Sequence, residues 1–279
     1  MNVSYDKLGK LHLEITGNHL GEGPWKLSDM LDFIRADKYC SKELIIEARG
    51  YHLLMDVPFD KSMYHIKGVI IDCGSIKMLS NLGIRLDGFV VNASNCITCE
   101  AGALSNDKIG FLQMNTKRDI FMEEESAQGL ECQRVELRAI PFNESRVQLK
   151  EGSFKDLSCS TLDIYSTGIL DWRNPVFQGA KIECARIKAL GFTGKRRFMP
   201  NASVDRLKLD LGNKPKYSTV DYPITPAFFE DTSIGNAEIE GGLGFTTRNR
   251  DIINPDHKPV SEKAKVSKTK PPSLIKFTS

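Results

Sequence analysis

Residues 69–118 decide the fold of this chain, and they read VIIDCGSIKM LSNLGIRLDG FVVNASNCIT CEAGALSNDK IGFLQMNTKR. Two series run through this stretch in steps of five residues, one from Val69 to Met114 and the other from Ile71 to Thr116. Fifteen of their 20 positions are apolar, against nine of the other 30. Neither an α-helix nor a flat strand produces such a period.

A chain that turns corners explains the spacing. Two residues that are two apart in an extended segment point to the same side. If the chain turns every five residues, each side of a coil contributes two side chains to the interior, and four sides close a coil of about 20 residues. Such coils stack about 4.8 Å apart, so that similar side chains form ladders. The pattern therefore predicts a mainly β fold, a parallel β-helix or solenoid.

The same rhythm returns in three shifted frames, over residues 130–147, 152–169 and 175–192. Each shift, near residues 119, 148 and 173, predicts a bulge or a loop that leaves the core. The solenoid is therefore expected to occupy residues 64–192.

The last of these frames resembles a known motif, in which a small residue stands two positions before a central Leu or Phe. The closest matches are Ala180-Lys-Ile182-Glu-Cys184 and Ala185-Arg-Ile187-Lys-Ala189. On these residues the chain resembles the pentapeptide-repeat proteins, which implies a right-handed, four-sided β-helix. Bulky residues at Ile84, Phe89 and Ile109, and the missing Asp or Asn before the centre, depart from the motif. They leave open a less regular β-solenoid, and a β-sandwich or α+β fold is the remaining alternative.

The flanks differ in composition from the array. Residues 1–63 are expected to form a small α/β cap, with strands at 11–16 and 43–48 and a helix at 29–36 that Ser28 caps. Residues 193–256 are expected to form a Pro-rich, irregular extension, because eight of the 12 prolines follow residue 192. Residues 257–279, with six lysines and one glutamate, read as a basic, disordered tail.

Composition narrows the class of protein. The 279 residues carry 38 Lys and Arg against 36 Asp and Glu, so the chain is neither a strongly basic nucleic-acid binder nor strongly acidic. No apolar run has the length of a signal peptide or a membrane span. Seven cysteines, an odd number, indicate free thiols in a reducing compartment. We expect a cytoplasmic protein, and the resemblance adds delivery into a host cell as an option.

Catalytic patterns are sparse. The five histidines show no metal spacing, and the single CxxC, Cys96 to Cys99, lacks a second pair or a nearby histidine. No Walker loop, nucleophile elbow or dinucleotide fingerprint appears. We therefore predict no catalytic residue, no metal and no cofactor.

Three short segments are candidates for binding. An acidic patch is expected where the first frame shifts, and a basic edge follows the last repeat. The third segment places an aromatic residue between charges, either as an interface anchor or as a plug at a corner. The candidate residues are Glu123, Glu124 and Glu125; Lys195, Arg196 and Arg197; and Asp171, Trp172 and Arg173.

These observations favour a non-catalytic protein–protein interaction module. The resemblance implies an inhibitor or a secreted effector, since the family includes DNA gyrase inhibitors that imitate duplex DNA and proteins delivered by bacterial secretion systems. One alternative is a β-helix enzyme acting on polysaccharide, with Asp163, Asp171 and Arg173 converging on one face. Another is a DNA-mimicking regulator, which the array's net charge of −1 disfavours. Nucleic acid is not expected on the solenoid and is left to the basic tail; a homodimer stays open.

Overall fold

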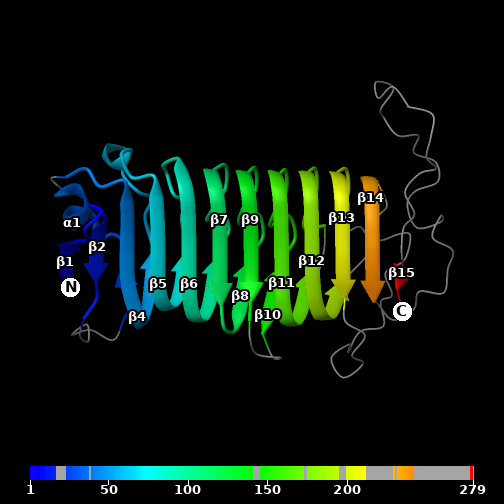
Figure 1. The fold of residues 1–279 in the computed structure, drawn as a ribbon, viewed down its shortest axis with the longest axis horizontal. Helices are drawn as coiled ribbons and strands as arrows, with labels where there is room; N and C mark the ends of the chain where they lie inside the picture. The colour runs from blue at the N-terminus through cyan, green and yellow to red at the C-terminus, as the bar shows by residue number, and fades with distance from the viewer. Residues whose placement is uncertain are drawn as a thin grey trace.

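A computed structural model describes residues 1–16, 23–37, 39–140, 145–172, 175–194, 199–211, 229, 231–241 and 277–278. It contains 58% strand and 4% helix, and its parallel strands form a solenoid of about seven turns. The coils stack along the longest axis of the molecule (Figure 1). The predicted mainly β solenoid is confirmed.

The elements follow one another along the stack, from the N-terminal end to the C-terminal end (Figure 1). Their bounds are β1 Asn2–Tyr5, β2 Leu11–Glu14, β3 Trp25–Lys26, α1 Leu31–Arg35, β4 Glu43–Met55, the 3₁₀ helix η1 Lys61–Met63, β5 Gly68–Met78, β6 Leu86–Cys99, β7 Lys108–Thr116, β8 Asp119–Met122, β9 Glu131–Ala139, β10 Arg146–Leu149, β11 Ser158–Trp172, β12 Lys181–Gly194, β13 Ser203–Leu211, β14 Ser233–Gly241 and β15 Phe277–Thr278.

Each regular coil has three parts: a long strand segment, a short strand segment beyond a corner, and a turn. The first part of β6 pairs with β7 and its last four residues pair with β8, so β7 and β8 together form the next coil. In the same way β11 pairs with β9 through its first part and with β10 through its last part. We call the two strand surfaces the long-strand side and the short-strand side.

Ladders of apolar side chains fill the interior. In-register pairing places one residue of each coil directly beside its equivalent in the next coil. Each member of the longest ladder is at most 1% exposed, and burial of a side chain of this size contributes about 1.5–3 kcal/mol. The ladder consists of Leu13, Ile46, Ile71, Val91, Met114, Leu137, Ile164, Ile187, Leu209 and Ile239.

The turns stack as regularly as the strands. A residue with positive φ, a conformation that suits Gly, Asn and Asp, precedes each long strand from β6 to β14. Neighbouring turns are joined by backbone hydrogen bonds, for example from Asn106 N–H to the Gln128 carbonyl at 2.8 Å. The Asn106 side chain also lies over Gly129, where an added Cβ would meet its Oδ1 at 2.5 Å. The positive-φ series is Gly83, Asn106, Gly129, Asp156, Gly179, Asn201 and Asp231.

The coils are longer and less uniform than the five-residue register predicts. A 20-residue coil separates Val69 from Phe89, but the later coils of this ladder contain 23, 23, 27, 23, 22 and 30 residues. Several positions predicted to face inward lie at corners or outside. Leu79 is 41% exposed, and Asn81 and Ser94 are exposed as well. In the 27-residue coil the extra residues lie at the corner between the long strand β9 and the short strand β10.

The N-terminal region contains the strands β1 to β4 and the short helix α1. Strands form at the two predicted places, as β2 and β4, but α1 begins only at Leu31. The predicted cap is wrong: Ser28 does not cap the helix, because its hydroxyl donates to Asp56 Oδ2 at 2.6 Å.

The stack extends beyond both expected boundaries of residues 64–192. Strand β4 already pairs in parallel with β5, so the solenoid begins before residue 64. Strands β13 and β14 continue the stack inside the segment expected to be irregular. Most of residues 257–279 lie outside the described residues, so the prediction of a disordered tail is not tested there.

The seven cysteines are free, and four of them are buried: Cys73, Cys99, Cys132 and Cys159. Burial raises the pKa of the Cys99 thiol to about 12, which leaves it protonated and unreactive at neutral pH. None of the helices in the described ranges combines the length and the apolar character needed to cross a membrane.

Candidate functional site

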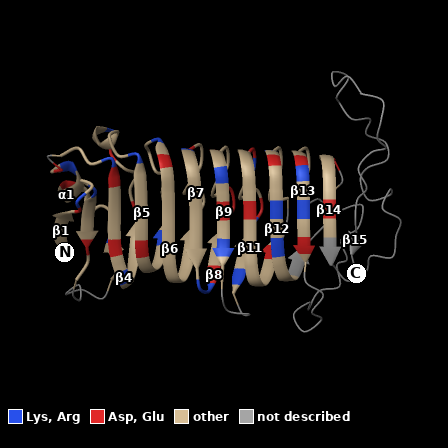
Figure 2. Ribbon diagram, in the orientation of Figure 1, with Lys and Arg blue, Asp and Glu red and all other residues tan. Residues whose placement is uncertain are grey.

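The long-strand side changes character along the stack. Figure 2 shows bands of charge on β9, β11, β12 and β13, whereas β6 and β7 are mostly uncharged. A shallow hollow with a volume of about 610 Å³ lies over the charged strands. We call it the charged groove, and its charged and aromatic lining residues are Arg134, Arg138, Asp163, Tyr165, Arg186, Lys188, Lys208 and Asp210.

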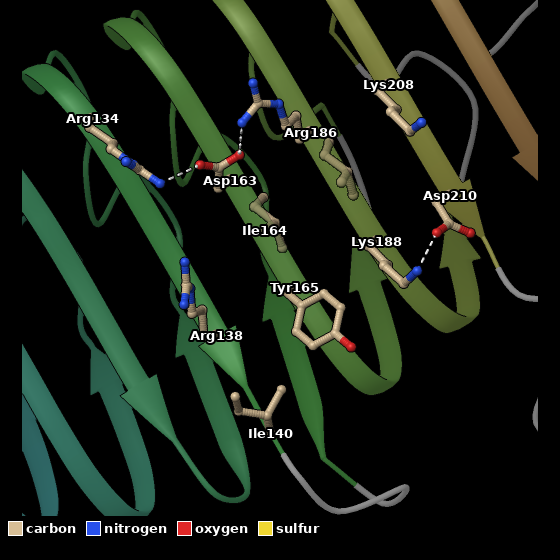
Figure 3. Close-up of a pocket in the computed structure, with 11 residues that line it drawn as sticks. Arg134, Arg138, Ile140, Asp163, Ile164, Tyr165, Arg186, Lys188, Lys208 and Asp210 are labelled. Carbon is tan, nitrogen blue, oxygen red and sulfur yellow. Dashed lines mark hydrogen bonds and ion pairs between the residues drawn. The ribbon is translucent and has the colours of Figure 1, made fainter.

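Asp163, on β11, pairs with arginines on both neighbouring strands, which form the two walls of the charged groove. Arg134 Nη2 lies 3.1 Å from Asp163 Oδ2, and Arg186 Nη1 lies 3.8 Å from Asp163 Oδ1. The arginines project from β9 and β12, the strands on either side of β11, and converge on the carboxylate (Figure 3). The guanidinium of Arg134 also lies over the ring of Phe111, 5.9 Å from its centroid. Arg134 is therefore held from both sides.

Glu136 lies beneath the basic side chains of β9 and pairs with them. It is 3% exposed although it belongs to the outward row of β9, because longer side chains cover it. Its carboxylate accepts from Gln113 Nε2 at 3.2 Å, pairs with Arg138 Nη2 at 3.0 Å and contacts Arg134 Nη2. Charge-assisted contacts of this kind fix arginine side chains that would otherwise move freely.

Lysines form the opposite wall. Lys188 on β12 pairs with Asp210 on β13, and Lys208 pairs with Glu238 Oε1 at 3.2 Å. The ring of Tyr165 stands between the walls, since strand register places Tyr165 between Arg138 and Lys188 (Figure 3). The groove thus has a half-buried aromatic floor and basic walls.

The charges of the groove are sorted by depth. The five basic side chains Arg134, Arg138, Arg186, Lys188 and Lys208 are 42–62% exposed. The carboxylate side chains of Glu136, Asp163 and Asp210 are only 4–29% exposed. Five positive charges thus face three negative charges that lie deeper, so the layer that a partner would meet is cationic.

The N-terminal half of the long-strand side, over β4 to β7, is built differently. Asn92 Nδ2 donates to Asp72 Oδ1 at 2.7 Å, and Asn115 Nδ2 donates to Asn92 Oδ1 at 2.8 Å. This polar row runs beside an aliphatic row of half-buried side chains, Ile45, Ile70 and Val90. We call the two rows together the amide face.

The predicted residues Asp171 and Trp172 lie inside the protein. Trp172 is 1% exposed and Asp171 is 6% exposed, so the interpretation of Trp172 as an exposed interface anchor is wrong. Register places Trp172 between Leu149 and Gly194, and Gly194 has no side chain to compete for space. This agrees with the interpretation as a plug. Arg173 lies outside the described residues.

The three glutamates follow β8 and enter the turn. Glu124 and Glu125 are exposed, as expected for a projecting patch. Lysines offset two of the three charges: Lys150 pairs with Glu123, which raises the Lys150 pKa, and Lys155 lies 3.7 Å from Glu125. Lys195, Arg196 and Arg197 lie outside the described residues.

Sequence reasoning missed the charged groove, except for Asp163. Its residues are 22–27 apart in the chain: Glu136, Asp163, Arg186 and Lys208 occupy one row, and Arg138, Tyr165 and Lys188 occupy the next. A 20-residue coil does not superimpose these positions. The true coil length was the signal that could have found them.

Comparison with known proteins adds no relative. No protein-family model matches the chain, and neither curated proteins nor solved structures give a match. Fold and site together define the class as a β-solenoid with a charged groove on its long-strand side.

Proposed function

We propose that this protein is a non-catalytic protein–protein interaction module and that the charged groove is its binding surface. One observation carries the proposal: exposed basic side chains, held by more deeply buried carboxylates, lie on the strands next to the half-buried Tyr165 ring. Preorganised Arg and Tyr side chains are typical of binding hot spots, because little side-chain entropy is lost on association.

The geometry favours binding over catalysis. A general acid or base must be able to exchange a proton with substrate, but Glu136 and Asp163 are each engaged by two arginines. The predicted convergence of Asp163 with Asp171 is absent, because a register shift between Ser166 and Ile169 places them on different sides of the coil. The polysaccharide-enzyme alternative loses its support.

The DNA-mimic alternative also receives no support at this surface. Imitating duplex DNA requires a dense, exposed layer of negative charge. In the charged groove the exposed layer is positive, and the carboxylates lie beneath it.

The family assignment is part of the proposal. The 20-residue coil from Val69 to Phe89 supports a pentapeptide-like repeat, and the longer coils support the less regular β-solenoid. A role as an inhibitor or a delivered effector rests on the resemblance alone. The free thiols support a reducing compartment such as the cytoplasm.

Position-specific cross-linking tests the proposal. A photoreactive phenylalanine analogue replaces Tyr165 in the charged groove or, as a matched control, Phe121, a half-buried aromatic residue on the short-strand side. Irradiation in extract from the source cells should give a discrete protein adduct at position 165 only. The adduct should weaken when Arg138 and Lys188 are changed to Gln. Equal labelling at both positions, or none at position 165, contradicts the proposal.

A further inference from the structure

The shape of the charged groove limits what can enter it. Its floor follows β11 through Asp163 and Tyr165, and its walls stand on β9 and β12 (Figure 3). These two strands are two spacings apart, about 10 Å. That width accommodates one extended chain. A nucleic-acid duplex is broader, since its major groove alone spans about 12 Å.

The walls fix the charge of the occupant. Arg138 and Lys188 face each other across the Tyr165 ring, and their side chains are 42% and 54% exposed. Their carboxylate partners, Glu136 and Asp210, are less exposed, so the basic groups keep hydrogen-bonding capacity directed outward. An occupant with carboxylates can form charge-assisted bonds to both walls.

The spacing along a wall fits an extended polypeptide. Arg186 and Lys188 are two residues apart on β12, so their side chains repeat about every 6.7 Å. Side chains at alternate positions of an extended peptide have the same repeat. Every second acidic side chain of such a peptide can therefore reach the same wall.

Tyr165 indicates that the occupant also has an apolar side chain, in addition to its negative charges. Its ring is half-buried in the floor and offers an apolar surface between two basic groups. An aromatic or aliphatic side chain of the occupant would pack on this ring while its acidic neighbours pair with the walls.

We infer that the charged groove binds an extended, Asp/Glu-rich polypeptide segment with an apolar or aromatic residue among its acids. The segment lies along β11 with its carboxylates on Arg138, Arg186 and Lys188. This inference rests on the proposed function and specifies its partner. Single-stranded nucleic acid and sulfated glycans share the negative charge and are the competing ligands in the test.

The test measures binding of four labelled probes to the full-length protein by fluorescence anisotropy. The first is the peptide Glu-Glu-Phe-Glu-Glu-Phe-Glu-Glu, and the second has Gln in place of every Glu. The third is an oligothymidylate and the fourth is a heparin oligosaccharide, both of similar length. The acidic peptide should bind saturably and more tightly than the other three, with an affinity that falls as salt is added.

Two double variants with equal net charge locate the site. Arg138→Gln with Lys188→Gln removes one basic group from each wall. Lys77→Gln with Lys108→Gln removes two lysines that are 52% and 57% exposed outside the groove. The groove variant should weaken binding of the acidic peptide by about tenfold or more, and the control by less than about twofold. Thermal melting of both variants checks that the fold is retained.

Each result decides the inference. Tighter binding of the oligonucleotide or the glycan, equal binding of the Gln peptide, or equal effects of the two double variants overturns it. If position 165 cross-links to a protein but the acidic peptide does not bind, this inference fails and the proposed function stands. If neither occurs, both fail.

Discussion

The two halves of the long-strand side share one interior and differ in their exteriors. Under both the amide face and the charged groove the same ladder continues, and Val91 and Ile187 are equally buried members of it. Outside, one half carries amides and aliphatic side chains, and the other carries arginines, lysines and a tyrosine. The comparison teaches that the inward side chains of each strand specify the fold. The outward side chains that alternate with them can vary and can therefore determine which partner binds.

The largest expected effect tests whether the two interiors are equivalent. Val91→Asp and Ile187→Asp each bury an unpaired charge and should each cost about 4 kcal/mol or more in the free energy of unfolding. Urea titration followed by circular dichroism measures the loss. The outward neighbours provide controls: Val90→Asp and Lys188→Ala should cost less than about 1 kcal/mol. A control that is as damaging as its inward partner would show that the assignment of inside and outside is wrong.

The second prediction concerns the pH dependence of stability. Asp107 is a buried carboxylate in a turn, at a position that apolar residues occupy in the neighbouring coils. Asp107 follows Ile84 and precedes Leu130 at equivalent coil positions, and it accepts a backbone hydrogen bond from Leu82 at 2.9 Å. Burial raises the pKa of Asp107 to about 6 from an ordinary value of 3.8, although backbone N–H groups oppose the shift. The folded state therefore binds more protons than the unfolded chain between these values.

Stability contributed by Asp107 is present at low pH and is lost as the pH rises through about 6. The expected loss is about 2–3 kcal/mol. Asp107→Asn keeps an acceptor and cannot ionise, so its stability relative to the wild type should increase between pH 4 and pH 7, measured by urea titration at each pH. A constant difference over this range would exclude a raised pKa.

The next largest expected effect on stability comes from removing the buried carboxylate of the charged groove. Glu136→Gln removes the carboxylate that pairs with Arg138 and one of the two carboxylates that pair with Arg134, and it should cost about 2 kcal/mol. Glu238→Gln at the rim, where the side chain is 46% exposed, should cost less than about 0.5 kcal/mol. Chemical denaturation measures both costs. Similar values would show that the buried carboxylate contributes no more to stability than the exposed one.

The smallest effect concerns the amide face. Asn92→Ala removes the residue that links Asp72 to Asn115 and should cost about 1 kcal/mol. Asn95→Ala, at an exposed position of the same strand, serves as its control and should be neutral. Thermal melting can resolve this difference, and a neutral Asn92 variant would mean that the amide row adds nothing to stability.

Sequence predicted the solenoid because apolar residues that face inward must recur at each coil. It predicted the coil length less well, because corners such as Leu79 carry apolar residues without burying them. Prolines after residue 192 concealed β13 and β14, whose inward residues follow the ladders of the earlier coils: Leu207 and Leu209 on β13, and Ala237 and Ile239 on β14.

The candidate site was largely beyond sequence reasoning. Charged residues on a solenoid become neighbours only through the register between coils. Arg138 and Tyr165 are 27 residues apart and Tyr165 and Lys188 are 23 apart, so a 20-residue coil does not bring them together. Trp172 is flanked by charged residues in the sequence, which is typical of an exposed site, but its side chain is buried in the coil.

The 27-residue coil owes its extra length to the corner between its long and its short strand. Strands β7 and β8 are separated by residues 117–118, whereas β9 and β10 are separated by residues 140–145, and these four additional residues account for the 27-residue coil. The next coil nevertheless resumes in register, with Asp156 continuing the positive-φ series. Residues can thus be inserted at this corner without changing the strand register of the next coil. Ile140, at this corner, also lines the charged groove, so the place that admits extra residues adjoins the candidate binding surface.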